Sequence, residues 1–222
     1  MNEPRRIDVR GLDPAELDLG PVIAHLAGGG LLVYPTETVY GIGCQLHAAT
    51  LETLRWLKLR GPADPFLLLV SGREGAPGLV WTAAALEMAR IFWPGALTLV
   101  LADPGGRFPG AVRSAKGAVA VRRSSHPLAA RIVSESGEAL VSTSANAHGE
   151  LPARNGDAAL TVARRLGGGS ETWVLDAGEL PWSAPSTIVD CTGPVPSLVR
   201  EGSIPVDRLR CVLPEIHGAT AK

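Results

Sequence analysis

The sequence predicts an α/β fold with a twisted, mixed sheet flanked by helices. Short apolar runs recur along the chain between segments of helical periodicity. Several of these runs lack polar alternation, which indicates strands buried on both faces of a sheet. No fixed-period repeat, low-complexity tract or long linker divides the 222 residues. We therefore expect a single domain over residues 1–222.

The expected strands are the apolar runs at residues 31–34, 66–70, 97–101, 118–121, 139–141, 172–175 and 187–189. The expected helices cover residues 21–27, 49–58, 82–92, 127–135, 157–166 and 206–212. In the second of them Leu51, Leu54 and Leu57 share one face, and Gly61 and Pro62 stop the helix from continuing. The small and polar residues at 214–222 predict a frayed tail.

Composition and charge exclude several classes of protein. With 45% hydrophobic and 19% charged residues, the chain can bury a core and is not disordered. A net charge of −1 argues against binding nucleic acid through bulk electrostatics and favours a small-molecule ligand. The cysteines, Cys44, Cys191 and Cys211, are too far apart for a disulfide framework or a zinc knuckle. We expect a cytoplasmic protein without a signal sequence or membrane span.

The sequence lacks the common signatures of nucleotide, metal and hydrolase sites. Its glycine clusters at residues 28–30 and 167–169 match neither GxxxxGK[ST] nor GxGxxG. It contains no HExxH or GxSxG segment, and its histidines show no ligand spacing. We therefore expect no protein-bound metal, and any ATP must be bound largely by side chains.

The segment PTETVYGIG at residues 35–43 follows directly on the expected strand 31–34. Ligands gather at the carboxyl ends of strands in α/β sheets. The hydroxyls of Thr36 and Thr38, the carboxylate of Glu37 and the phenol of Tyr40 are therefore candidates for a pocket wall. The alternative is a capped turn without a ligand.

Lys58 and Arg60 stand at the end of an expected helix. Cations at that position stabilise the helix dipole without any functional role, which is the alternative explanation. The following turn, residues 61–65, leads into the buried strand 66–70 and holds both charges near the sheet. Phosphate groups could meet them there.

A basic stretch without Asp or Glu covers residues 104–134. Its cations are Arg107, Arg113, Lys116, Arg122, Arg123 and Arg131. It predicts an anion-facing rim, with a solvated basic face as the alternative. Arg122 ends an expected strand, where its planar guanidinium can bind a carboxylate through two parallel hydrogen bonds.

Small polar side chains follow another expected strand, at residues 142–146 (STSAN). They fit either a turn that satisfies its own backbone or a cradle for ribose and phosphates. Ser186 precedes an expected strand, and Arg200 ends the stretch 196–199. Taken one by one, these two are explained as polar residues at strand ends.

Taken together, these segments resemble the YrdC-like family. The resemblance rests on PTETVYGIG at 35–43, Lys58-x-Arg60, FWPGALTLVL at 92–101, VAVR at 119–122, HPLA at 126–129, STSAN at 142–146, STIVD at 186–190 and LVREG at 198–202. The motifs occur in order across a core of about residues 20–205.

The resemblance implies a YrdC-like fold around a large, concave, basic cavity and the activity of threonylcarbamoyl-AMP synthase, in the single-domain form. The threonine-facing set that it implies is Thr36, Arg122, Ser142 and Ser186. The nucleotide-facing set is Lys58, Arg60, Ser144, Asn146 and Arg200, of which Lys58 and Arg60 are the expected catalytic pair. Thr38 and Tyr40 complete the implied pocket wall.

The resemblance also implies ligands and partners. The substrates would be ATP, L-threonine and bicarbonate, with Mg²⁺ held mainly by the ATP phosphates. The product would serve N6-threonylcarbamoyladenosine (t6A) modification of tRNA through a threonylcarbamoyl-transferase complex. The alternatives are a YrdC-like protein that binds double-stranded RNA and a paralogue with another carbamoyl acceptor.

The chain departs from the family pattern at four positions. Leu69 stands where many relatives have histidine, and Ser124 replaces a usual proline. Ala153 and His148 stand where hydroxyl residues are common. These departures bear on the choice of substrate and not on the fold.

Overall fold

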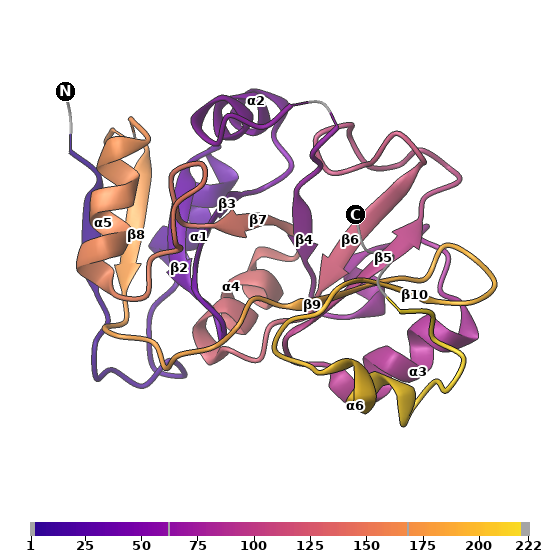
Figure 1. Ribbon diagram of the computed structural model, residues 1–222. Helices are drawn as coiled ribbons and strands as arrows, with labels where there is room; N and C mark the ends of the chain where they lie inside the picture. The colour runs from indigo at the N-terminus through magenta and orange to yellow at the C-terminus, as the bar shows by residue number, and fades with distance from the viewer. Residues whose placement is uncertain (1–2, 62, 168, 219–222) are drawn as a thin grey trace.

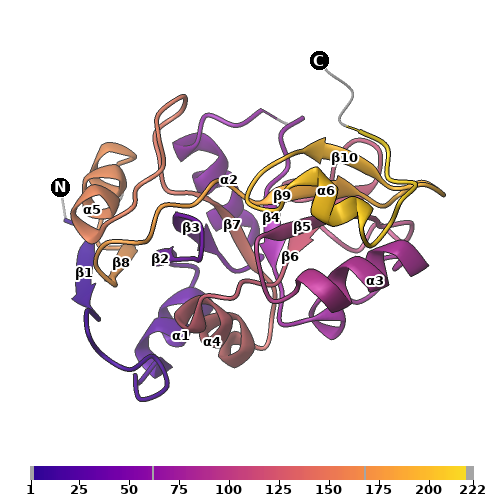
Figure 2. The same cartoon turned by 60° about the horizontal axis from the view of Figure 1, so that its bottom comes forward.

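A ten-stranded mixed sheet forms the frame of the molecule in the computed structural model, which describes residues 3–61, 63–167 and 169–218 (Figure 1). Within these residues the strand order is β1-β8-β2-β3-β7-β4-β6-β5-β9-β10. Strands β1 and β8 lie at one end with helix α5, while β9 and β10 lie at the other end with α6 (Figure 2). The predicted α/β class with a mixed sheet is confirmed.

All seven predicted strands are present. They are β2 (Leu31–Pro35), β4 (Leu67–Leu69), β5 (Leu97–Ala102), β6 (Ala118–Arg122), β7 (Leu140–Ser144), β8 (Thr172–Asp176) and β9 (Thr187–Asp190). Three further strands were not predicted as such: β1 (Arg5–Asp8), β3 (Tyr40–Cys44) and β10 (Ser197–Arg200). Two of these, β1 and β10, are edge strands, and β3 lies between β2 and β7.

The six predicted helices are confirmed to within two residues at each end. They are α1 (Gly20–Ala27), α2 (Ala48–Leu57), α3 (Ala83–Phe92), α4 (Pro127–Ser136), α5 (Gly156–Arg165) and α6 (Val206–Arg210). A short 3-10 helix, η1 (Arg73–Gly75), follows β4. Among the described residues, no helix is both long and apolar enough to cross a membrane.

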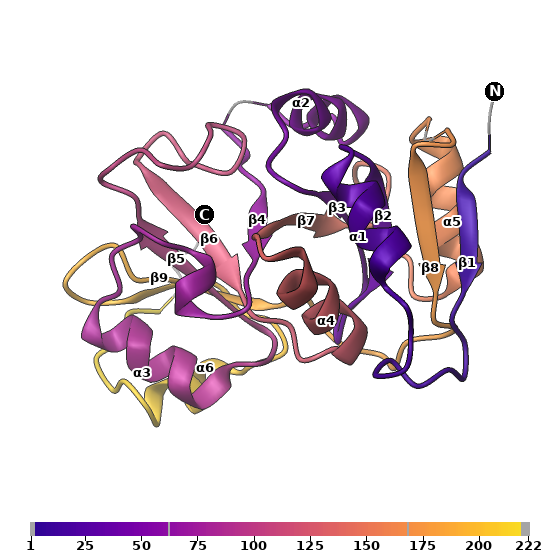
Figure 3. The same cartoon turned by 180° about the vertical axis from the view of Figure 1, so that it is seen from behind.

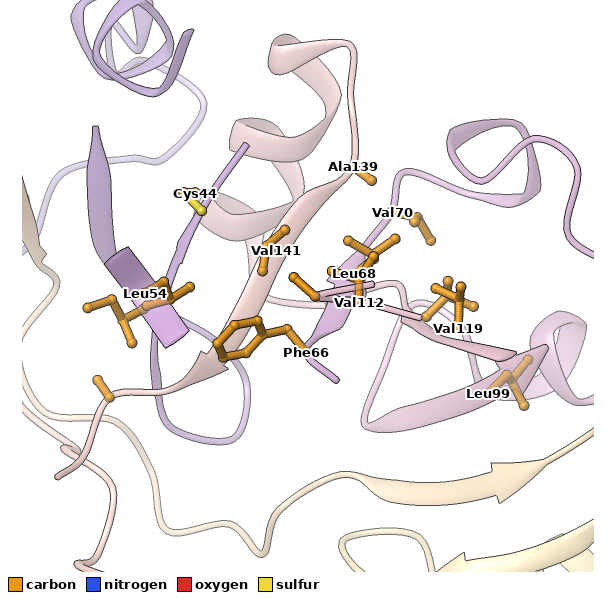
Figure 4. Packing of buried hydrophobic residues seen from close by; sticks show 14 of the residues in the cluster. Cys44, Leu54, Phe66, Leu68, Val70, Leu99, Val112, Val119, Ala139 and Val141 are labelled. Atoms are coloured by element: carbon orange, nitrogen blue, oxygen red, sulfur yellow. The ribbon is translucent and has the colours of Figure 1, made fainter. Parts of the chain in front are cut away.

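Helices cover both faces of the sheet. Successive side chains on a strand point to opposite faces, so Leu68 and Val141 belong to one buried cluster while Leu69 and Leu140 belong to another. The first cluster includes residues of α2, α3 and α5. Figure 4 shows part of it, with Leu54 of α2 and with Leu68 and Val141 of the sheet. The second packs against α1 and α4, which lie side by side (Figure 3).

The prediction of a frayed tail over residues 214–222 is wrong for its first part. Ile216 is buried, and His217 forms a bridge with Ser197. The backbone oxygen of His217 accepts a hydrogen bond of 3.0 Å from Leu198, which anchors the segment to β10. Residues 219–222 lie outside the described residues.

Candidate functional site

A pocket opens on the face of the sheet that carries α1 and α4. In the sheet register, Ser142 lies beside Leu67, while Arg122 lies beside Thr98. Thr98 in turn pairs with Ile188 on β9. Because alternate residues of each strand share a face, side chains from β7, β4, β6, β5 and β9 meet in one hollow. The hollow has a cavity volume of about 270 Å³, close to the lower end of the usual range of ligand sites.

The pocket brings together eight of the eleven site residues predicted from the sequence. Those that line it are Thr36, Thr38, Arg60, Arg122, Ser142, Ser144, Ser186 and Arg200. The other three, Tyr40, Lys58 and Asn146, are not among its lining residues. Lys58 and Asn146 nevertheless form hydrogen bonds with Ser144, which does line the pocket.

Thr36 and Thr38 lie in the turn between β2 and β3, and both are buried. The hydroxyl of Thr36 donates to the backbone oxygen of Val39 at 2.6 Å and accepts from the backbone N–H groups of Thr38 and Val39 at 3.2 Å each. The Thr36 hydroxyl therefore holds its own turn, as the capped-turn alternative requires. The same turn also forms one wall of the pocket.

Ser142 and Ser144 project from β7 into the pocket. The phenol of Tyr34, buried on β2, donates to the hydroxyl of Ser142 at 2.7 Å and so leaves the Ser142 proton free for another acceptor. The hydroxyl of Ser144 donates to the side-chain oxygen of Asn146 at 2.8 Å. The Asn146 amide nitrogen donates to the backbone oxygen of Glu150 at 2.7 Å. Asn146 thus organises the segment that follows β7.

The ammonium of Lys58 is directed at this same segment. It donates to the backbone oxygen of Ser144 at 2.9 Å, to the side-chain oxygen of Asn146 at 2.7 Å and to the Asn146 backbone oxygen. Lys58 is only 5% exposed. Burial, with a smaller contribution from Arg60, lowers the pKa of Lys58 to about 8. Its donors are used by the protein, so in this state Lys58 acts on the pocket through Ser144 and Asn146.

Arg60, by contrast, lines the pocket directly. Its guanidinium lies 4.9 Å from the centre of the Phe66 ring and donates to the backbone oxygen of Pro65 at 3.0 Å and to the hydroxyl of Thr143 at 3.3 Å. Burial lowers the pKa of Arg60 from its ordinary value. These contacts hold a rigid cation at the side of the pocket formed by β7.

Arg200 and Ser186 meet on the opposite side of the pocket. The guanidinium donates to the backbone oxygen of Ser186 at 2.8 Å and 3.2 Å, while the Ser186 hydroxyl lies 2.9 Å from that of Thr98. The pKa of Arg200 is lowered by burial and then by repulsion from Arg122. Two cations that repel each other across a hollow favour an anion between them.

Arg122 ends β6 on the floor of the pocket and is only 5% exposed. Its Nε lies 3.7 Å from Oε1 of Glu37, a distance that allows an ion pair but is too long for a hydrogen bond. The structure gives Arg122 no hydrogen bond from its side chain to the other described residues. Its guanidinium is therefore available to a ligand.

The prediction that Tyr40 completes the pocket wall is wrong. Tyr40 begins β3, where its neighbour Gly41 faces the pocket and its own ring packs in the core on the other side. The phenol donates to the backbone oxygen of Gly178 at 2.8 Å and accepts from the backbone N–H of Ala177 at 3.0 Å. Burial raises the pKa of Tyr40 to about 12. Tyr40 therefore ties β3 to the segment that follows β8.

The basic stretch at residues 104–134 does not form a continuous rim. Of its cations, only Arg122 lines this pocket. Arg113 forms an ion pair of 3.1 Å with buried Asp103, and Arg131 binds Glu135 and the backbone oxygen of Leu17. Much of the stretch therefore serves the fold.

The departures from the family pattern have different surroundings. Leu69 is buried beside α1 and α4, and Ala153 is buried in the larger core. His148 is exposed. Ser124 is buried near the pocket, where its hydroxyl donates to Oε2 of Glu37.

Three residues that shape this site were not among the predicted site residues: Tyr34, Thr98 and Ser124, of which Ser124 was noted only as a departure from the family pattern. Each acts through a partner that is distant along the chain, and the pairing of Tyr34 with Ser142 spans 108 residues. Glu37 was noted as a carboxylate of the turn, but its contact with Arg122 was not foreseen. The sequence did contain one signal for Tyr34 and Thr98, because a phenol or hydroxyl inside an apolar strand needs a hydrogen-bond partner.

The donor set of the pocket suits anions better than cations. The lining residues include three arginines and several hydroxyls but no carboxylate or imidazole. No cluster of three or more His, Cys, Asp or Glu residues occurs in the described ranges. Because Mg²⁺ prefers oxygen ligands with negative charge, these side chains do not fit a resident magnesium ion.

Comparison with known proteins gives consistent matches over most of the chain. The family model Sua5_yciO_yrdC, described as telomere recombination, matches residues 24–202. A Mycobacterium leprae relative is 37% identical over 217 residues, which cover 96% of this chain and 94% of the relative. The threonylcarbamoyl-AMP synthase of Chromohalobacter salexigens is 35% identical over 175 residues, covering 78% of this chain and 91% of that enzyme.

Solved structures share the fold. The crystal structure of P. abyssi Sua5 complexed with L-threonine superposes with a TM-score of 0.85 at 28% sequence identity. The match covers 97% of this chain and 63% of that chain, so the present protein spans just under two thirds of its length.

Proposed function

Because the chain belongs to the Sua5_yciO_yrdC family, we propose that it is a threonylcarbamoyl-AMP synthase. The enzyme joins L-threonine, bicarbonate and ATP to form L-threonylcarbamoyladenylate and pyrophosphate. The product supplies the threonylcarbamoyl group for t6A modification of tRNA, through a transferase that accepts it. The reaction belongs in the cytoplasm, where free cysteines such as buried Cys44 and Cys191 stay reduced.

One observation carries this proposal. Arg60, Arg122 and Arg200 line a single pocket without a carboxylate among the lining residues, in a protein whose net charge is −1. Threonine carries a carboxylate, its carbamate adds a second negative charge, and ATP brings a triphosphate. A hollow with three arginines and several hydroxyls matches these groups.

The chemistry needs few specialised groups. Bicarbonate condenses with the threonine amine with loss of water, or dissolved CO2 adds to the amine with loss of a proton. Either route gives a carbamate, which is already an anion at neutral pH. A carbamate oxygen attacks the α-phosphorus of ATP. The bond from that phosphorus to the bridging oxygen breaks, and pyrophosphate leaves. Positioning and charge stabilisation therefore supply most of the acceleration.

The side chains divide into two sets around this reaction. Arg122 orients the threonine carboxylate, and the hydroxyls of Ser142 and Ser186 border the same ligand. Arg60 and Arg200, which both line the pocket, neutralise charge along the triphosphate.

Lys58 supports the nucleotide half of the pocket. Its ammonium holds the Ser144 and Asn146 segment in place and adds positive charge beside it. Mg²⁺ enters with ATP, held by the phosphates, because the pocket lining offers no carboxylate to bind it.

Mass spectrometry of the product tests the proposal. The protein is incubated with ATP, L-threonine and ¹³C-bicarbonate, and we expect an adenylate that contains threonine and one ¹³C atom. An adenylate of threonine without the labelled carbon would contradict the reaction. Labelled product formed equally well with other amino acids would favour a paralogue with another carbamoyl acceptor. Salt-dependent RNA binding without any product would favour the RNA-binding alternative.

A further inference from the structure

Three buried polar atoms without hydrogen-bond partners belong to Glu37 and to two residues that interact electrostatically with it, Arg122 and His126. Among the described residues, Oε1 of Glu37, Nε of Arg122 and Nδ1 of His126 are all buried and make no hydrogen bond. Buried polar atoms usually have partners, so a cluster of such atoms beside a candidate site calls for an explanation. The cluster links the β2–β3 turn to the segment between β6 and α4.

Glu37 does not belong to the pocket wall, although its neighbours Thr36 and Thr38 do. Its carboxylate lies instead by Arg122, with Oε1 3.7 Å from Nε, and its side chain is 17% exposed. A charge enclosed in this way is stabilised chiefly by an opposite charge at short range. Glu37 and Arg122 therefore act as one unit, in which only the arginine reaches the ligand.

Ser124 fixes the other oxygen of this carboxylate. Its hydroxyl donates to Oε2 of Glu37 and accepts a hydrogen bond of 3.2 Å from the backbone N–H of His126. Ser124 is 3% exposed, so water competes little for these bonds. The arrangement occupies Oε2 and leaves Oε1 for Arg122. A proline at position 124 could not do this, since it has no hydroxyl.

The contact between Arg122 and Glu37 is an ion pair without a hydrogen bond. At 3.7 Å the Nε of Arg122 is about half an ångström or more beyond hydrogen-bond distance from Glu37. A small movement of the guanidinium toward Oε1 would complete the bond, and Arg122 also lines the pocket. A planar guanidinium held from behind at Nε can present two parallel N–H groups to a carboxylate.

We propose that Glu37 and Ser124 are positioning residues that orient Arg122 for the carboxylate of the amino-acid substrate. This inference rests on the proposed function, because it takes an amino acid as the ligand of Arg122. It assigns the affinity for the amino acid to a relay that runs from Ser124 through Glu37 to Arg122. Neither positioning residue needs to touch the substrate.

The test separates the two substrates. Initial rates of pyrophosphate release give KM for L-threonine and KM for ATP in wild type, Glu37→Gln, Ser124→Ala and Ser124→Thr. We expect Glu37→Gln to raise KM for threonine about tenfold, because Arg122 loses the charged partner of its ion pair. Ser124→Ala shifts it in the same direction by a smaller factor, and Ser124→Thr, which keeps the hydroxyl, restores it. KM for ATP stays within about twofold throughout.

A matched control makes the same chemical change elsewhere. Glu87→Gln removes the carboxylate of the surface pair Glu87–Arg90 on α3, and we expect both KM values to stay at the wild-type level. Thermal unfolding confirms that each variant is folded. An unchanged threonine KM in folded Glu37→Gln, or an equal rise of both KM values, would overturn the proposal that Glu37 and Ser124 orient Arg122.

Failure of the relay and failure of the proposed function give different results. Wild-type protein that releases pyrophosphate only with threonine supports the function, whatever the variants do. Wild-type protein that releases none with threonine refutes the function and removes the ligand assigned to Arg122.

Discussion

The ammonium of Lys58 donates a hydrogen bond of 2.7 Å to the side-chain oxygen of Asn146, 88 residues further along the chain. The same nitrogen also donates to the backbone oxygens of Ser144 and Asn146. The end of α2 is thereby joined to the end of β7 at the border of the pocket. Through this contact a lysine that does not line the pocket can influence the residues that do.

We predict that Lys58→Ala lowers pyrophosphate release by about a hundredfold or more, because the Ser144 and Asn146 segment loses its anchor and the pocket loses a charge. The variant remains folded but loses about 1–3 kcal/mol of stability, since three partly buried acceptors lose their donor. Steady-state rates and thermal unfolding measure both effects. Lys116→Ala, at an exposed lysine, is the matched control and keeps full activity. Equal rates in wild type and folded Lys58→Ala would refute the role.

The lowered pKa of Lys58 predicts a loss of activity on the alkaline side. Since this pKa is about 8 rather than 10.5, the ammonium loses its proton as pH rises through about 8. A neutral amine has only two N–H donors for three acceptors, so the Ser144 and Asn146 segment loosens. We expect kcat/KM for ATP to fall above about pH 8 in wild type. Lys58→Arg stays charged and should lack this fall, and an identical profile would contradict the assignment.

A rise in pH is expected to lower activity through Lys58 but to raise the contribution of Lys58 to stability. Between about pH 8 and 10.5 the unfolded chain keeps the proton on Lys58, while the folded protein has released it. The unfolded state therefore binds more protons in this window, and the contribution of Lys58 to the free energy of unfolding rises with pH. Comparison of wild type with Lys58→Met by chemical denaturation at pH 7.5 and pH 10 isolates the contribution. A fall with pH would show that the pKa is not lowered.

Substitution of Arg122 is expected to change KM for threonine and not KM for ATP. In Arg122→Lys the charge remains but the planar pair of N–H groups is lost, so KM for threonine should rise at least about tenfold. KM for ATP should change little. Arg123→Lys makes the same change at the exposed neighbouring residue and should leave both values at the wild-type level. An Arg122→Lys enzyme with unchanged threonine KM would rule out the carboxylate contact.

Gly43 is needed for the close approach of β3 to β7. A Cβ atom at this position would lie 1.8 Å from the backbone oxygen of Val141. Gly43→Ala should therefore destabilise the protein by about 3 kcal/mol or more, measured as a loss in free energy of unfolding. A Cβ at Gly61 meets no atom within 4 Å, so Gly61→Ala should change stability by less than about 0.5 kcal/mol. Similar stabilities of both variants would contradict the packing.

The elements predicted correctly are those in which local sequence and tertiary packing agree. Helix α2 carries Leu51, Leu54 and Leu57 on one face, and all three are buried. Strand β3 was missed because two of its five residues are glycines, which weaken a strand signal. Its glycines are explained by the neighbouring strands, because a Cβ at either position would crowd β7 and Tyr34 of β2. Strand β1 reads Arg-Arg-Ile-Asp and is held by pairing with β8 and by the ion pair of Arg6 with Asp176.

Site residues could be predicted where a recognisable motif stands at the end of a strand or helix. They were harder to predict where the role depends on contact with a residue far away in the sequence. Arg60 and Arg122 were noted from their places at the ends of elements, whereas Arg200 was implied only by the family resemblance; the fold places all three in one pocket. Tyr40 was predicted to lie in the pocket wall but packs in the core, because the position at which β3 begins decides which face of the sheet its ring occupies. The contact of Glu37 with Ser124 depends on how the β2–β3 turn meets the end of β6. No local pattern contains that information.

Pyrophosphate release with each substrate omitted in turn tests the central claim most directly. The assay uses purified protein and ATP in buffer freed of CO2, with L-threonine and bicarbonate added singly and together. The account predicts rapid release only when ATP, threonine and bicarbonate are all present. Release at the same rate without threonine or without bicarbonate would contradict it.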